Sequence, residues 1–289
     1  MVIIIIKIAL SIMAGVLAGP AAVYVFNHVP GQWLCDYGEN PVERSNVLAR
    51  ARRLSEQEVE NIQRSLVDPD FRRIKENPWR WIFAAGFICI CLSLSLQAGN
   101  PLASLQAGDS QLFSMQLALA GLLVCWALLL IALSDQIYMI IPDQFLLILL
   151  LAGAGMLPIH AKAMEAELGK FMNELTGCRF SCGMLAAIYI LAGIVIGVLL
   201  MLLVALLGKI ISGEAALGMG DIKLYAVLGF AIGACGTVFV FLLSTLTAGI
   251  AAGLGLAKGK NGRRDHRPLG PHICIAAVIY IFIILPFTL

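Results

Sequence analysis

Two aspartates stand at the edges of long apolar stretches of this chain. Asp135 directly follows the apolar run 112–134, and Asp221 opens the apolar run 221–257. An ionisable side chain at membrane depth is costly, so a carboxylate in such a place indicates a functional site. Two aspartates that share one proton can hydrolyse a peptide, because the ionised carboxyl activates a water molecule and the protonated one donates to the scissile carbonyl. We therefore predict that Asp135 and Asp221 form a catalytic pair.

Two glycines precede the second aspartate. We expect Gly218 and Gly220 to adopt backbone angles that are closed to other residues, and to let an extended substrate approach the chain closely. The alternative is a glycine-rich loop in which Asp221 only caps the start of a helix, where a negative charge is favourable.

A third aspartate lies between these two. Asp143 follows Pro142, and proline is typical of the first turn of a helix. Asp143 would then sit beside the positive end of the helix dipole. We interpret Asp143 as structural or supporting, and it is the main rival to Asp135 as the first acid of the pair.

The composition places these residues in a membrane protein. The 289 residues are 60% hydrophobic and 13% charged, and the mean hydropathy is +0.90, whereas a soluble domain carries about 25% charged residues. A membrane-spanning helix needs about 20 apolar residues, so we expect the overlong run 221–257 to break near Gly233 and Gly236. The sequence predicts an all-α, polytopic membrane protein with about eight transmembrane helices. The expected spans are 2–26, 79–96, 112–134, 138–157, 184–207, the two halves of 221–257, and 269–289.

Basic residues predict which side of the membrane each loop faces, because loops rich in Lys and Arg stay in the cytoplasm. Segment 27–80 and loop 258–267 are strongly basic, whereas loop 97–111 has no Lys or Arg. With eight spans, the two basic segments face the cytoplasm and both termini face the other side. Asp135 and Asp221 then lie at the cytoplasmic ends of their helices, at the same depth.

Segment 27–78 is the one sizeable polar region. Ser55 and Glu58 have the spacing of a capping box, which predicts a helix that continues to about Leu66. Phe71–Trp81 mixes basic and aromatic residues, which is typical either of an amphipathic helix on the membrane surface or of a solvated charged loop. We divide the chain into a first transmembrane helix (1–26), a cytoplasmic loop domain (27–78) and a multi-helix transmembrane domain (79–289).

The cysteines and histidines do not predict a metal site. The eight cysteines include no pair of C-x-x-C motifs, and the four histidines have no ligand-like spacing. Cys178 and Cys182 lie four residues apart in a polar loop, where they either form a disulfide or remain free thiols. The net charge of +2 gives no indication of a nucleic-acid partner.

Three motifs occur in a familiar order. Asp135–Asp143 has the pattern D-x6-P-D, and Gly213–Lys223 has a Gly-Glu pair followed by G-x-G-D. Arg267–Pro271 is similar to the P-F-G-P box that opens the last helix of one protein family. Together, over about residues 112–275, these segments resemble the type IV prepilin peptidases, which are intramembrane aspartyl proteases of the G-x-G-D kind.

The resemblance implies a membrane aspartyl endopeptidase that removes the leader peptide of prepilins or pseudopilins at the cytoplasmic face of the bacterial inner membrane. Asp135 and Asp221 would be its catalytic residues. Its partners would be the precursor substrate and the lipid bilayer, and proteolysis would need no cofactor. Many members of the family also methylate the new N-terminus with S-adenosylmethionine. The supporting residues would be Pro142, Asp143, Glu214, Gly218, Gly220 and Lys223.

The N-terminal third departs from the family pattern. Segment 27–78 lacks the two C-x-x-C pairs that are common there and holds only Cys35, while Ala22–Pro30 faintly resembles the family's N-x-x-x-x-R-x-P stretch. An alternative from another class is a membrane transporter in which Asp135 and Asp221 relay a proton or a cation. The sequence shows no inverted repeat, and both acids lie at one edge of the membrane, which favours the peptidase.

Overall fold

The computed structural model describes residues 2–52, 54–97, 110–155, 182–212, 218–257 and 268–284. Every regular element within these ranges is a helix, which confirms the all-α prediction. Glu214, Cys178 and the basic loop 258–267 lie outside the described residues. The helices are α1 (Val2–His28), η1 (Gly31–Leu34), α2 (Pro41–Arg52), α3 (Glu56–Val67), α4 (Glu76–Gln97), α6 (Ser110–Tyr138), α7 (Asp143–Ala154), α9 (Cys182–Ser212), α10 (Met219–Ala257), α11 (Gly270–Ile279) and the π-helix η2 (Tyr280–Ile284).

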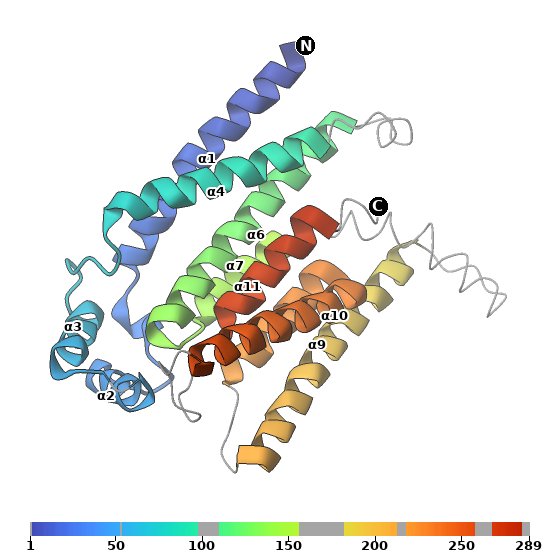
Figure 1. Cartoon of the computed structure of the whole chain (residues 1–289). Coiled ribbons are helices and arrows are strands. Elements are labelled where there is room, and N and C mark those ends of the chain that lie inside the picture. Colours follow the sequence, from blue (N-terminus) through green and yellow to red (C-terminus); the bar gives the residue numbers. More distant parts are fainter. Residues whose placement is uncertain are drawn as a thin grey trace.

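The long helices pack in three groups that lie next to one another. α1 pairs with α4, α6 packs against α7 and α11, and α9 packs along α10. Figure 1 shows the short helices α2 and α3 at one end of this bundle, beside the C-terminal ends of α1 and α6. The N-terminal ends of α10 and α11 lie toward the same end. Four chain segments that are far apart in sequence therefore meet at one end of the molecule.

Four described helices are long and apolar enough to cross a membrane. The apolar side chains of α9 are largely exposed, as expected of a helix that faces lipid. The two shorter apolar helices are α7 and the α11–η2 segment. The four spanning stretches are Ile8–His28, Leu119–Tyr138, Gly183–Ile210 and Met219–Gly255.

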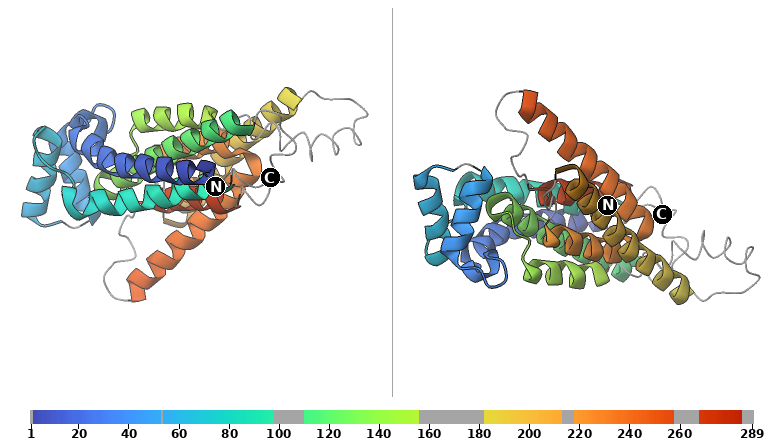
Figure 2. Two further views of the ribbon diagram at one scale, coloured as in Figure 1. Left: turned by 90° about the horizontal axis from the view of Figure 1, so that it is seen from above. Right: turned by 90° about the horizontal axis from the view of Figure 1, so that it is seen from below.

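Helix α10 is broken at Gly233, as the sequence predicts. This residue has φ 71° and ψ −174°, a backbone conformation that glycine reaches without strain. The second leg of α10 diverges from the other long helices (Figure 2). The described apolar helices are α1, α4, α6, α7, α9, the two legs of α10, and α11. Four of these described helices are long enough to span a membrane, so the expected count of eight spans stays a prediction.

The expected span 138–157 is wrong in its length. α7 has only 12 residues, about 18 Å of helix, which is too short to cross a bilayer core of about 30 Å. The reason is local: α6 continues through Tyr138, Met139 then takes a left-handed conformation, and Pro142 precedes the new helix. The chain therefore turns between α6 and α7 instead of starting a full span.

The polar segment contains the expected capping box. The Glu58 carboxylate accepts hydrogen bonds from the Ser55 backbone N–H (2.9 Å) and from its hydroxyl (2.8 Å), and α3 begins there. Phe71–Trp81 is neither one amphipathic helix nor a fully solvated loop. Residues 71–75 are not helical, and α4 begins at Glu76. Most of the segment is exposed, but Ile74 is buried, and the Asn27 side chain binds its backbone N–H and carbonyl (2.9 and 3.1 Å).

The contact between α9 and α10 depends on glycine. The backbones approach so closely that a Cβ atom added at Gly229 would lie 2.3 Å from the Gly193 carbonyl oxygen. In the reverse direction, a Cβ atom at Gly193 would lie 2.5 Å from the Gly229 carbonyl oxygen. Small residues at membrane helix interfaces allow such close backbone packing.

We therefore expect Gly229→Val to destabilise the protein by about 1–3 kcal/mol or more, because the added atoms can be placed only by separating two backbones. Gly249→Val is the matched control on the same helix, since a Cβ atom there meets nothing within 4 Å. Thermal unfolding of the detergent-purified variants measures both effects. Equal midpoints for the two variants would contradict the glycine-dependent contact.

Candidate active site

Asp135 lies in the last turns of α6 and is almost fully buried, with 6% of its surface exposed. Its Oδ2 atom accepts a hydrogen bond of 2.7 Å from the backbone N–H of Gly270, the first residue of α11. The first N–H groups of a helix have no partner within the helix and carry a partial positive charge. The carboxylate of one helix is thus bound by the N-terminus of another.

Gly270 leaves no room for a side chain beside this carboxylate. A Cβ atom added there would lie 2.6 Å from Asp135 Oδ2 and 2.9 Å from Asp135 Cβ. Pro271 follows at the start of α11, where the missing N–H of a proline costs nothing. Residues 269–271 therefore begin α11 and place the free backbone N–H of Gly270 against the Asp135 carboxylate.

Asp221 lies in the first turn of α10 and is brought to Asp135. Its backbone N–H donates to the Gly218 carbonyl oxygen (3.2 Å), and its Oδ1 atom is buried and has no hydrogen-bond partner among the described residues. The charge of Asp135 acts directly on Asp221, and the charges of both act on the buried thiol of Cys274, one turn after Gly270. Helices α6, α10 and α11 thus converge on the buried carboxyl of Asp135 and the half-buried carboxyl of Asp221, whose Oδ1 has no partner among the described residues.

Asp143 is in a different environment. Both of its oxygens accept hydrogen bonds from Lys223 Nζ, at 2.8 and 2.9 Å, and the two side chains are 68% and 50% exposed. An exposed ion pair of this kind contributes about 0–1 kcal/mol. Asp135, and not Asp143, is therefore the acid whose charge acts on Asp221. Asp143 instead links α7 to α10 at the surface through its ion pair with Lys223.

The expected backbone angles at the two glycines are wrong. Neither Gly218 nor Gly220 has a positive φ. Gly220 instead permits close packing, because an added Cβ atom would lie 3.1 Å from Ile141 Cβ, while the surroundings of the exposed Gly218 are open. Pro142 directly precedes α7, and its carbonyl accepts from the N–H of Phe145 (3.1 Å), so it supports the start of that helix.

The sequence analysis missed the residues that hold the turn after Asp135. Arg44 and Arg52 of α2 donate to backbone carbonyls of residues 136–139, and Ser134 Oγ donates to the Ile140 carbonyl (2.9 Å). Arg44 is only 7% exposed. Burial lowers the pKa of Arg52, and the nearby charge of Asp135 acts in the opposite direction. Arg44, Leu48 and Arg52 share one face of α2 at i, i+4 and i+8, which is the only pattern that could have indicated them.

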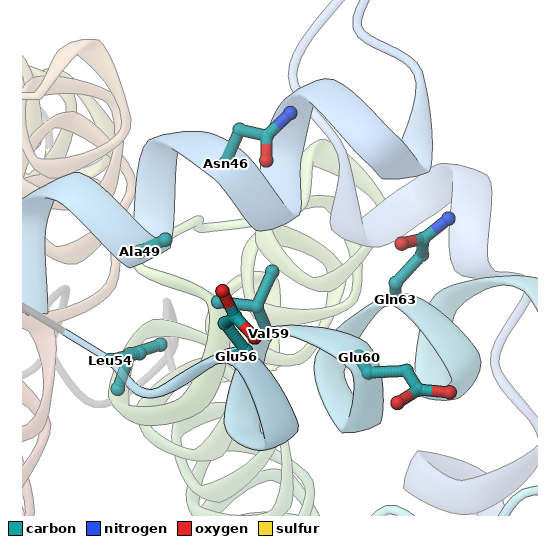
Figure 3. A pocket seen from close by; sticks show the side chains of 7 residues that line it. All are labelled: Asn46, Ala49, Leu54, Glu56, Val59, Glu60 and Gln63. Carbon is teal, nitrogen blue, oxygen red and sulfur yellow. The ribbon is translucent and has the colours of Figure 1, made fainter.

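A pocket of about 410 Å³ lies away from the aspartates, between α2 and α3. Figure 3 shows its rim, with the amides of Asn46 and Gln63 and the carboxylates of Glu56 and Glu60. Its lining includes no basic side chain for the carboxylate of S-adenosylmethionine, so the pocket does not fit that donor. Within the described ranges, no group of three His, Cys, Asp or Glu residues is arranged to hold a metal ion.

The fold and the site together define a helical membrane protein in which a buried aspartate, Asp135, and a half-buried aspartate, Asp221, come from separate helices. Residues 122–253 match the model of the type IV leader peptidase family. The matched range includes Asp135, Asp143 and Asp221. Gly270 lies outside it, although it binds Asp135.

The chain is also similar to curated proteins. The chain is 30% identical over 162 residues to a prepilin leader peptidase/N-methyltransferase of Aeromonas hydrophila, covering 56% of this chain and 48% of the relative. It is also 30% identical over 164 residues to the protein of the same name from Aeromonas salmonicida strain A449, with the same coverage. The chain therefore spans about half the length of these relatives. No solved structure matches the chain.

We expect Gly270→Ala to displace the Asp135 carboxylate and to remove its hydrogen bond, which costs about 1–3 kcal/mol when a buried charged group loses its partner. Gly218→Ala is the control, because an added Cβ atom there approaches nothing closer than 3.7 Å. Chemical or thermal unfolding of both variants tests the difference. A Gly270→Ala protein as stable as Gly218→Ala would argue against the Asp135–Gly270 bond.

Proposed function

We propose that this chain is a membrane aspartyl endopeptidase that cleaves the leader peptide of type IV prepilins or pseudopilins, with Asp135 and Asp221 as its catalytic pair. One observation carries the proposal: the buried carboxyl of Asp135 and the half-buried carboxyl of Asp221, on helices far apart in sequence, are near enough for the charge of Asp135 to act on Asp221. The type IV leader peptidase match across both residues, and the names of the relatives, support the substrate class.

The geometry suits acid–base hydrolysis of a peptide bond. Two carboxyls so close cannot both ionise cheaply, so they share one proton, which belongs to the pair and not to either residue. The ionised member takes a proton from the attacking water, and the protonated member donates to the scissile carbonyl. Asp135 is held in place by the Gly270 N–H, while the free Oδ1 of Asp221 is available for the water or for the substrate.

We infer that the pair faces the cytoplasm of a multi-pass inner-membrane protein. The polar segment with α2 and α3 lies at the end of the bundle where α6 ends (Figure 1), and α2 binds the residues that follow Asp135. This segment is rich in arginine, and basic segments next to membrane helices stay in the cytoplasm. Gly218 is exposed beside Asp221 and offers an open approach for an extended peptide.

Methylation is a separate question from cleavage. The relatives are named as N-methyltransferases as well as peptidases, which supports S-adenosylmethionine as a second substrate of the family. The pocket between α2 and α3 does not fit this methyl donor, so the proposed function is cleavage and no residue is assigned to methyl transfer. Nothing in the family match supports the transporter alternative.

We predict that Asp135→Asn and Asp221→Asn each lower cleavage of a co-expressed pilin precursor by at least about 100-fold, because each removes one member of an acid–base pair. Asp143→Asn should retain substantial cleavage, because it removes only an exposed ion pair with Lys223. Immunoblotting of precursor and mature pilin measures all three variants.

The protein level of each variant must match that of the wild type for the comparison to count. Full processing by either catalytic variant would reject the assignment of the pair. An inactive but normally folded Asp143→Asn protein would instead move the first catalytic acid to Asp143.

A further inference from the structure

The turn that follows Asp135 is strained and rich in polar backbone groups. Met139 has φ 53°, a left-handed conformation that a residue with a side chain rarely adopts. Its N–H donates to the Asp135 carbonyl (2.9 Å), so the strained residue and the aspartate belong to one turn. The last carbonyls of a helix have no partners within the helix, and here they must be bonded from outside.

Two arginines of α2 supply those partners. Arg44 donates from Nη2 to the carbonyls of Tyr138 (2.7 Å) and Met139 (2.8 Å), and from Nε to Tyr138 again (3.2 Å). Arg52 donates from Nη2 to the Gln136 carbonyl at 2.6 Å, and it reaches the next carbonyl from Nη1. Four consecutive carbonyls, from residue 136 to residue 139, are thereby bound by two side chains that lie more than 80 residues earlier in the chain.

A strained backbone persists only where its surroundings over-determine it. Residue 139 is held by two contacts: Arg44 binds its carbonyl, and Ser134 Oγ binds the carbonyl of the next residue, Ile140. If the turn relaxed, the last residues of α6 would rotate and carry Asp135 away from Gly270 and Asp221. A displacement of about 1 Å in a catalytic group is enough to cost up to about 100-fold in rate.

From these contacts we propose that Arg44 and Arg52 are positioning residues, which hold the strained turn after Asp135 and so aim its carboxyl at Asp221. The inference rests on the proposed function for its activity readout. The polar segment then takes part in the site through hydrogen bonds to the backbone of the turn, without touching the substrate.

Arg44→Gln is the main test, because glutamine cannot span two carbonyls as a guanidinium does. We expect kcat for cleavage of a purified pilin precursor to fall by about 10- to 100-fold, with KM within about two-fold of the wild type. Arg50→Gln is the matched control on the same helix, since Arg50 is exposed and makes none of these bonds, and it should leave both constants unchanged.

A second substitution separates positioning from folding. Met139→Gly removes the strain, because glycine adopts a positive φ at no steric cost. In the Arg44→Gln background it should restore kcat by at least about five-fold, which is the non-additivity expected of residues that act through one turn. If Arg44→Gln lowered kcat only by destabilising the fold, Met139→Gly would not restore it. A double variant whose effects on kcat are additive would therefore overturn the proposal.

Backbone amide exchange gives a readout that does not depend on activity. In detergent-purified protein, residues 139–141 should exchange faster in Arg44→Gln than in the wild type and the Arg50→Gln control. Unchanged exchange, or unchanged kcat, would overturn the proposal. A wild-type protein that does not cleave the precursor would sink the proposed function instead, and the exchange experiment would still decide whether Arg44 holds the turn.

Discussion

A carboxylate that is withdrawn from water must find its hydrogen bonds and its compensating charge inside the protein. The Asp135 carboxylate accepts its hydrogen bond from the Gly270 N–H, 135 residues later in the chain. The end of its helix, α6, is bound by α2, more than 80 residues earlier. The contact with Gly270 tolerates no side chain, because a Cβ atom at position 270 would overlap the carboxyl. The convergence of α2, α6 and α11 is therefore a consequence of burying this one acid.

The same constraint separates the roles of the three aspartates. Asp143 has water and Lys223 around it, so it is a satisfied surface group that links α7 to α10. Asp221 shares the buried environment of Asp135 and retains an oxygen without a partner among the described residues. Buried polar atoms without partners are uncommon and are expected at sites of chemistry. Environment, and not residue type, distinguishes Asp135 and Asp221 from Asp143, and supports them as the proposed catalytic pair.

Local signals in the sequence were sufficient for much of the fold. Apolar run lengths predicted the helices, Gly233 predicted the break in α10, and Ser55 with Glu58 predicted the start of α3, because each depends on neighbouring residues only. The roles of Arg44 and Arg52 could not be predicted in this way. Their partners are backbone carbonyls, which have no signature in the sequence, and an arginine in a polar segment has the same pattern whether it is solvated or buried.

The polar segment shows why that ambiguity matters. By composition its arginines indicate a cytoplasmic segment, yet Arg44, Arg52 and Arg73 direct their hydrogen bonds inward. All three bind carbonyls at the C-terminal ends of α6 or α1, where the helix dipole favours a positive charge. The same positive charges therefore fasten the polar segment to the C-terminal end of α1 and to that of α6, next to Asp135 in the chain.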